Sequence, residues 1–226
     1  GRAQRMSDIG PERYEAVLSW LAATGGRRGD MLLRARCAPH VRRIIAQRDS
    51  DAALAEDPSA CLAGKHYARV MPNGDVTPCP YLPTVVGNVR ERPFSEIWAS
   101  APLLAALRSP ALRGRCGSCE FASLCGGCRA RAFAATGDAF GEDPWCVYEP
   151  AGGPRVESPA VAWEPEAEAR LARIPAFVRG MVRRSLEARA RDRGLDRVTV
   201  DLVVEARARM PGRVGGHEDG PMRPDR

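Results

Sequence analysis

Hydrophobic side chains recur with helical spacing near the beginning of the chain. Within residues 11–24 they fall at i, i+3, i+4 and i+7, which is one face of an amphipathic helix, namely Tyr14, Val17, Leu18 and Leu21. Pro11 suits the first position of this helix, and the glycine pair at 25–26 is expected to end it. We expect residues 31–43 to be extended and the Asp- and Ala-rich residues 49–60 to form a connector.

The middle of the chain predicts a hairpin followed by helices. Residues 66–81 form two short alternating segments around Asn-Gly at 73–74, a strong hairpin signal because both residues tolerate the positive φ of a type I′ turn. Ser95 is expected to cap a helix over residues 96–108. The apolar side of that helix consists of Ile97, Trp98, Leu104 and Leu107. Another short helix is predicted for residues 129–136.

The last third of the chain predicts a helical module behind a linker. Residues 151–162 are rich in Pro, Gly and Ser and mark a boundary. From Trp163 onward apolar side chains again follow helical spacing, at Ile174, Phe177, Val178, Met181, Val182 and Leu186. Gly194 is expected to end this helix, and residues 199–209 favour a further helix. The tail over residues 210–226 is expected to be disordered.

Composition narrows the class of protein. Of the 226 residues 44% are hydrophobic, which favours a folded chain, and no run of about 18 apolar residues predicts a membrane span. The net charge of +6 comes almost wholly from arginine, since Lys65 is the only lysine. The arginines lack the interleaved aromatic residues of a single-strand binder, so no nucleic-acid partner is expected. Without a secretory leader the protein is expected to be cytoplasmic, and a start at Gly1 suggests further sequence upstream.

Eight cysteines carry the candidate chemistry: Cys37, Cys61, Cys79, Cys116, Cys119, Cys125, Cys128 and Cys146. In a reducing compartment such cysteines seldom form disulfides. Residues 116–128 (CGSCEFASLCGGC) have the spacing C-x2-C-x5-C-x2-C, with two glycines that let the backbone turn tightly around sulfur. Four thiolates per site suit either tetrahedral zinc or a 4Fe–4S cluster, and the spacing alone leaves both open.

The order of the cysteines resembles that of a known family. Cys61-x12-Gly74-x4-Cys79, then the knot at 116–128 and a final Cys146, is similar to the SPASM domain of radical S-adenosylmethionine enzymes, a domain that carries two auxiliary 4Fe–4S clusters. The motifs most similar to the branch that matures haem and haem d1 are CAPH at 37–40, NGDVTPCPY at 73–81, LCGGCRARA at 124–132 and EDPWC at 142–146. The resemblance favours clusters over zinc.

The resemblance also implies which cysteines share a cluster. Auxiliary cluster I would be held by Cys37, Cys61, Cys79 and Cys128. Auxiliary cluster II would be held by Cys116, Cys119, Cys125 and Cys146. The C-x2-C ending differs from the C-x3-C of many members, which bears on the assignment of Cys128 as a ligand. Some members leave one iron of cluster I open for substrate, which bears on the assignment of Cys37.

A second resemblance lies at the end of the chain. Residues 163–209 are similar to the small helical domain that ends a subunit of the light-independent protochlorophyllide reductase. The expected organisation is the end of a radical-enzyme barrel over 1–36, a SPASM-type domain over 37–150, the linker, and this helical domain. The fold class is thus α+β, with a β-hairpin and short helices around two clusters and a small helical domain behind them.

The family implies a function in tetrapyrrole chemistry. No C-x3-C-x2-C motif occurs, so the S-adenosylmethionine and third 4Fe–4S cluster of such enzymes would belong to an upstream domain. The implied enzyme, an oxidoreductase or lyase, would modify propionate side chains of an iron porphyrin, with ferredoxin or flavodoxin as reductant. Arg129, Arg131 or arginines of the last helices could pair with propionates, or serve as ordinary surface cations. His40 and His66 are candidates for hydrogen bonding around a cluster, or for a haem ligand.

Three other functions remain open at this point. The same clusters could serve a radical peptide maturase that oxidises or crosslinks a precursor peptide. The cysteines could instead form a zinc-ribbon adaptor that has no enzymatic activity and binds RNA or protein through its basic helices. A free-standing electron-transfer protein is the third alternative. Brown colour would separate iron–sulfur protein from colourless zinc protein.

Overall fold

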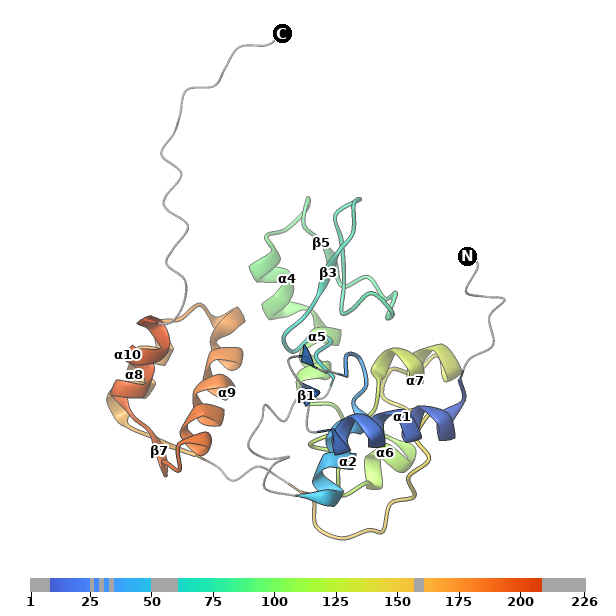
Figure 1. Cartoon of the computed structure of the whole chain (residues 1–226). Helices are drawn as coiled ribbons and strands as arrows, with labels where there is room; N and C mark the ends of the chain where they lie inside the picture. Colours follow the sequence, from blue (N-terminus) through green and yellow to red (C-terminus); the bar gives the residue numbers. More distant parts are fainter. Residues whose placement is uncertain are drawn as a thin grey trace.

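The computed structural model describes residues 9–24, 27–28, 31–32, 35–49, 61–156 and 161–208. It is a mixed α/β structure of several short helices and three very small sheets (Figure 1). The expected tail over 210–226 and most of the connector over 49–60 lie outside the described residues. Two-residue and three-residue strands bury little on their own, so the helices and loops supply most of the packing.

The first helix forms where its pattern predicts. Helix α1 (Pro11–Ala23) buries Tyr14 and Leu18, whereas Val17 on the same predicted face is exposed. Strands β1 (Arg27–Arg28) and β2 (Met31–Leu32) then pair antiparallel, and α2 (His40–Arg48) packs against α1. The extended conformation expected for residues 31–43 is therefore wrong from His40 onward, because Val41, Ile44 and Ile45 provide a helical apolar face.

The hairpin forms at the predicted place with a different turn. Strands β3 (Arg69–Val70), β4 (Asp75–Thr77) and β5 (Gly87–Asn88) make one antiparallel sheet in that order, with Val70 opposite Val76. Gly74 has φ 93°, but no other residue of the turn has a positive φ, which excludes type I′. Pro72 fixes its own φ near −65°, so the chain makes a tight turn closed by the amide of Gly74 donating to the carbonyl of Met71 at 2.9 Å.

The helix expected over residues 96–108 is two helices. Helix α4 (Phe94–Ser100) ends before Ala101, whose ψ of 121° is extended, and α5 (Pro102–Arg108) begins at once. A proline disfavours the helical conformation of the residue before it, which explains the break at Ala101. Pro93 rather than Ser95 precedes the first turn, and no side chain caps it.

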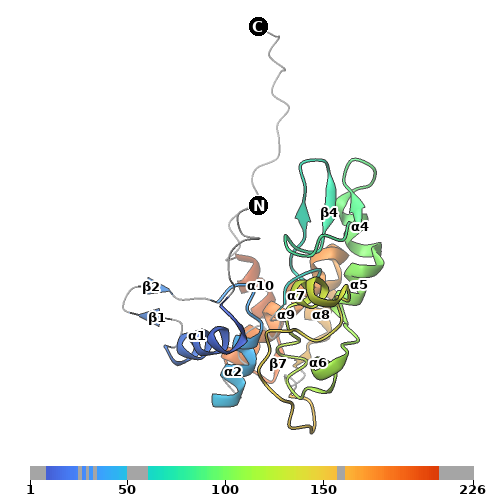
Figure 2. The same ribbon diagram turned by 90° about the vertical axis from the view of Figure 1, so that its right-hand side faces the viewer.

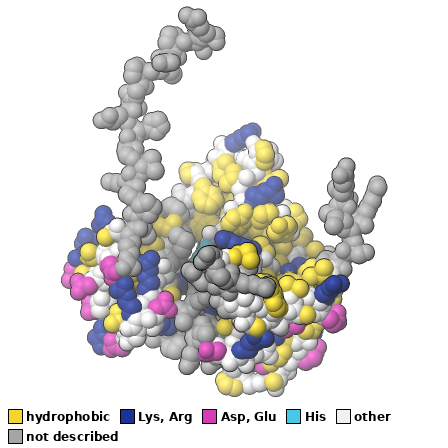
Figure 3. Space-filling view, in the orientation of Figure 1, with side chains coloured by type: hydrophobic (Ala, Val, Ile, Leu, Met, Phe, Trp, Pro, Cys, Tyr) yellow, Lys and Arg dark blue, Asp and Glu magenta, His cyan; other side chains and the backbone are white. Residues whose placement is uncertain are grey.

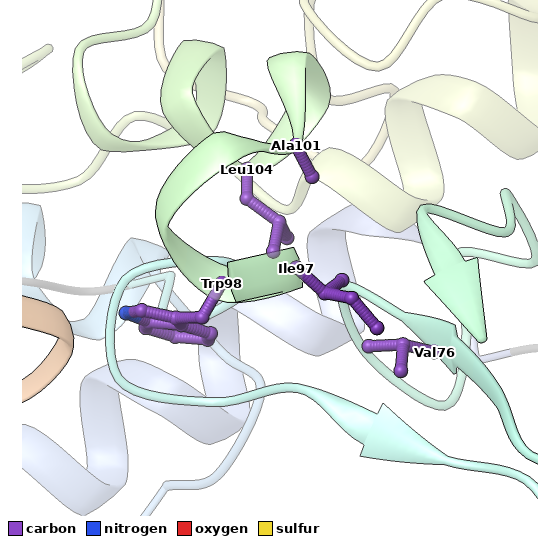
Figure 4. Packing of buried hydrophobic residues seen from close by; sticks show 5 residues of the cluster. All are labelled: Val76, Ile97, Trp98, Ala101 and Leu104. Carbon is purple, nitrogen blue, oxygen red and sulfur yellow. The ribbon is translucent and has the colours of Figure 1, made fainter. Parts of the chain in front are cut away.

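The four predicted apolar residues of this region are nevertheless all buried. Ile97, Trp98 and Leu104 pack with Ala101 and with Val76 of β4, as Figure 4 shows. Leu107 joins the neighbouring cluster that contains Leu82 and Ala130. These hydrophobic clusters are small and separate, and the cysteine-bearing loops run between them.

The remaining elements follow the sequence closely. Helix α6 (Gly114–Ser118) contains Cys116, the first cysteine of the knot, and α7 (Arg129–Thr136) follows Cys128. The last module consists of α8 (Pro165–Ala172), α9 (Ala176–Asp192) and α10 (Val200–Ala208) around a core that includes Leu186 and Leu202. Gly194, at φ 67°, ends α9 in the expected way. The sequence pattern did not reveal the parallel pairing of β6 (Ala162–Trp163) with β7 (Arg197–Val198).

The two parts of the molecule meet along one helix. In Figure 1 the three last helices form a group of their own, with α9 on the side of α4 and α5, and α9 packs beside α4. The β-hairpin and α4 extend away from the rest of the molecule in both Figure 1 and Figure 2. None of the helices described here has the length and apolar character needed to cross a bilayer.

Candidate metal centres

Four cysteine thiols line a single cavity. Cys116, Cys119, Cys125 and Cys146 surround a space of about 380 Å³, part of which opens to solvent. These are the four residues that the family resemblance assigns to auxiliary cluster II. They come from α6, from the loop after it and from the segment that follows α7, so the fold gathers residues up to 30 positions apart (146 − 116).

Tight local turns bring these thiols together. The amide of Cys125 donates to the carbonyl of Phe121 at 2.8 Å, which closes one turn between the two C-x2-C pairs. Gly127 then adopts φ 65°, a left-handed conformation that favours glycine. A Cβ at this position would lie 2.8 Å from Asp143 Cβ and 3.3 Å from the Cys116 sulfur. The backbone therefore needs glycine here for its conformation and for space.

A second group of three thiols lies behind the first. Cys79 follows β4, Cys128 precedes the first turn of α7, and both pack into the cluster around Leu82 and Leu107. Burial raises the pKa of the Cys79 thiol, and the neighbouring charges of Cys61 and Cys128 raise it further. Cys61 and Cys128 are therefore near enough to Cys79 to affect it electrostatically.

Cys37 stands apart from that group. It is exposed, and it is the one described residue other than glycine with a positive φ, 53°. Its carbonyl accepts a hydrogen bond of 3.5 Å from Arg131, in the helix that follows Cys128. The structure thus places the Cys37 backbone near α7, without a recorded contact between its thiol and the other three among the described residues.

The buried thiols are protonated in the absence of metal. Burial is the largest cause of a raised pKa at Cys119, Cys125, Cys128 and Cys146. Because metals bind the thiolate, ligation at these positions must release protons. No three His, Cys, Asp or Glu side chains in the described part of the chain converge closely enough to hold one metal ion.

A fully buried carboxylate lies between the two groups of thiols. Asp143 accepts hydrogen bonds from the amide of Cys128 at 2.7 Å, from the amide of Trp145 at 3.1 Å and from the guanidinium of Arg131 at 2.7 Å. His40 Nε2 lies 3.1 Å from the same carboxylate. Burial opposes ionisation of Asp143, but His40 and Arg131 hold its pKa well below its usual range. The Cys128 backbone and the turn before Cys146 therefore share one anchor.

His40 is a buried side chain beside the four thiols, and it lines the same space as they do. Its Nε2 lies 3.1 Å from the Asp143 carboxylate, and its Nδ1 has no hydrogen-bond partner in the described part of the structure. Because Nε2 donates to the carboxylate, Nδ1 would donate to a sulfide only if the ring carries both protons. The donor set of four cysteines fits an iron–sulfur cluster.

The arginines next to Cys128 make hydrogen bonds and an ion pair within the protein. Arg129 is buried and donates to the carbonyls of Ala139 and Gly141 at 3.0 and 2.9 Å. Arg131 is paired with Asp143 and lies over the Trp145 ring at 4.9 Å. Their hydrogen bonds support the cysteine loops, which leaves the arginines of the last helices as the candidates for propionates.

Sequence reasoning missed Asp143. Its signal was present in the EDPWC motif, where a lone aspartate stands three residues before the last cysteine. Lys65 lines a second cavity of about 330 Å³ that also contacts Cys61 and Cys125. Tyr67 is exposed on the loop before β3.

Two family models match parts of the chain. Residues 61–120 match the SPASM model, described as an iron–sulfur cluster-binding domain. Residues 163–207 match the model described as the proto-chlorophyllide reductase 57 kD subunit. Both resemblances expected from the motifs are thereby confirmed.

Several curated proteins are similar to this chain. AdoMet-dependent heme synthase of Methanosarcina barkeri is 39% identical over 160 residues, covering 66% of this chain and 46% of the relative. Pre-heme d1 synthase of Dinoroseobacter shibae is 44% identical over 89 residues, covering 37% of this chain and 22% of the relative. PqqA peptide cyclase of Methylocella silvestris is 38% identical over 104 residues, covering 42% and 28%. The chain spans less than half the length of these relatives.

Proposed function

We propose that this chain, which carries an iron–sulfur cluster-binding SPASM domain, is the auxiliary-cluster part of a radical S-adenosylmethionine enzyme that modifies propionate side chains of an iron porphyrin. The observation that carries the proposal is the cavity lined by four cysteine thiols, with the buried His40 beside them. The heme synthases cover 66% of the chain, against 58% for a mycofactocin maturase and 42% for the peptide cyclase, which supports a tetrapyrrole substrate.

The proposed ligands fall into two sets. Cys116, Cys119, Cys125 and Cys146 would hold one 4Fe–4S cluster. Cys61, Cys79 and Cys128 would hold a second, with Cys37 as its fourth ligand. Such clusters accept and pass on single electrons at potentials that the surrounding protein adjusts.

Several residues of this chain shape the surroundings of the proposed cysteine ligands. The apolar packing around Cys79, Cys128 and Cys125 limits access of water to the sulfur atoms. Asp143 orients the Cys128 amide, and Arg43 places positive charge beside Cys146, where it lowers the pKa of that thiol against the larger effect of burial. S-adenosylmethionine and a third cluster belong, in this proposal, to sequence outside this chain.

Anaerobic reconstitution with iron and sulfide tests the proposal. We expect about eight irons and eight sulfides per chain, with a broad absorbance band near about 400 nm. Replacing Cys125 with Ser should remove about four irons, and replacing Cys61 with Ser should remove the other four. The Cys37→Ser variant shows whether that residue is a ligand. Two tightly held zinc ions and a colourless protein would support the adaptor instead.

A radical peptide maturase is the second candidate. It is favoured by the match to PqqA peptide cyclase and by 35% identity over 139 residues to a mycofactocin maturase of Mycobacterium ulcerans. Turnover separates the two, because only the tetrapyrrole enzyme should release carbon dioxide or a shortened side chain from an iron porphyrin. A protein with both clusters that consumes S-adenosylmethionine with a precursor peptide and ignores porphyrins is the maturase.

A further inference from the structure

Two arginines from the two parts of the molecule meet at the loop that carries Cys61. Arg184 of α9 donates through Nε to His66 Nε2 at 2.9 Å, and its terminal nitrogen approaches the same atom. Arg108, the last residue of α5, donates through Nε to the carbonyl of Gly64 at 3.1 Å. Both guanidinium groups therefore contact the segment between Cys61 and β3.

The position of Arg108 is fixed by its surroundings. Its second hydrogen bond goes to the carbonyl of Trp98, and its guanidinium carbon lies 4.8 Å from the centre of the Trp98 ring. Burial lowers the pKa of Arg108, and the positive charge of Arg184 lowers it further. Two half-buried cations thus lie close enough to repel each other.

Neither cation has an anionic partner in the described part of the chain. The acceptors of Arg108 and Arg184 are carbonyl oxygens and an imidazole nitrogen, and none of them is a carboxylate. Other arginines of the last module differ: Arg170, Arg183, Arg193 and Arg197 each pair with a carboxylate. Arg179 also donates to carbonyl oxygens, but those belong to its own module, whereas Arg184 reaches the loop of the cysteine domain.

We propose that Arg108 and Arg184 form a binding site for a carboxylate group of the substrate. Naming that group as a propionate of an iron porphyrin rests on the proposed function. Guanidinium groups bind carboxylates through paired hydrogen bonds, and partial burial strengthens such contacts. The two arginines contact Gly64 and His66, the chain neighbours of Lys65, and Lys65 itself lines a cavity that contacts Cys61. Binding there gives the helical module a role in holding substrate beside the cysteine domain.

The test compares an iron porphyrin that has free propionates with its propionate methyl ester, by absorbance titration of the full-length, reconstituted protein. Arg184→Gln and Arg108→Gln should each weaken binding of the free acid about tenfold or more. Arg184→Lys keeps the charge without the paired geometry and should give an intermediate loss. Arg170→Gln, which removes an exposed paired arginine of the same module, should bind as the wild type does. The ester should bind weakly and equally to all of them.

The outcomes separate the inference from the proposed function. Equal binding of the free acid to wild type, Arg108→Gln and Arg184→Gln overturns the carboxylate site and leaves the enzyme proposal standing. Absence of porphyrin binding to the wild type, with both clusters loaded, overturns the enzyme proposal and this assignment with it. Iron content and circular dichroism identify a variant that fails to fold, and the comparison of acid with ester on the wild type does not depend on any variant. Tight binding of the ester to the wild type would contradict the site.

Discussion

Arg131 and Asp143 form an ion pair of 2.7 Å in which the carboxylate is fully buried. The pair connects α7 with the segment before Cys146, and the same carboxylate holds the amide of Cys128. The two predicted cluster positions are therefore mechanically joined through one side chain.

We expect Asp143→Asn to lower the free energy of unfolding by about 3 kcal/mol, because it leaves Arg131 without its charge partner in a buried network. Urea unfolding under anaerobic conditions measures this. Asp138→Asn is the matched control, since its pair with Arg113 is largely exposed, and only a small loss is expected there. Equal losses in the two variants would show that Asp143 is not a structural anchor.

Gly127→Ala tests the crowding beside Cys116. The new methyl group would lie 2.8 Å from Asp143 Cβ in a backbone at φ 65°, so we expect a clear loss of stability and of bound iron. Gly137→Ala has similar backbone strain at φ 75° but meets nothing within 4 Å, and should lose only about 1 kcal/mol with normal iron content. Iron analysis of both variants decides the matter, and normal iron in Gly127→Ala would count against the assigned cavity.

In the metal-free protein, exposed cysteines should be alkylated before buried ones. Cys37 is exposed and should react first with iodoacetamide near neutral pH. Cys125 should react last, because it is buried and burial raises the pKa of its thiol, which keeps the reactive thiolate scarce. Mass spectrometry of the modified peptides over time gives the order, and the denatured chain provides the reference. Comparable rates at Cys37 and Cys125 would contradict the described cavity.

The helical module should unfold without loss of iron. Leu186 is buried among Ala190, Val198 and Leu202, so Leu186→Ala is expected to destabilise this module by about 2–5 kcal/mol. Leu104→Ala, a substitution of the same size in the cysteine domain, should lower the iron content as well. Circular dichroism and iron analysis distinguish the two. Loss of iron in both variants would mean that the predicted boundary at residues 151–162 does not separate independent units.

The sequence patterns predicted where the hairpin and the helices lie better than they predicted the turn type and the helix ends. Asn-Gly at 73–74 located the hairpin, but the turn type depended on Pro72, whose fixed φ does not fit type I′. Pro102 was visible within the predicted helix over 96–108, and it divides that helix at Ala101. In both places a proline outweighed the broader pattern.

The candidate site depends on contacts that no local pattern contains. Spacing alone grouped only the cysteines of residues 116–128, and the two sets of four came from the family resemblance. Asp143 meets His40 across a separation of 103 positions (143 − 40), which periodicity and motif spacing do not register. The meeting of Arg108 with Arg184 likewise depends on how α9 packs beside α4.

The exposed face of the hairpin region is hydrophobic. Tyr67, Val70, Tyr81, Val85 and Phe94 are all exposed, and Figure 3 shows hydrophobic surface over this part of the molecule, whereas basic and acidic groups alternate on the last helices. Its position near Cys79 means that variants of this face should be compared for aggregation as well as for activity.

The small, separate hydrophobic clusters around the cysteine loops affect how long the protein survives. None of these clusters is large, so metal ligation would contribute directly to the stability of the fold. Oxygen that destroys a bound cluster would then loosen the loops between the hydrophobic clusters and expose them to proteases. In a cell, exposure to air would shorten the lifetime of the polypeptide itself, and its abundance would follow the supply of iron.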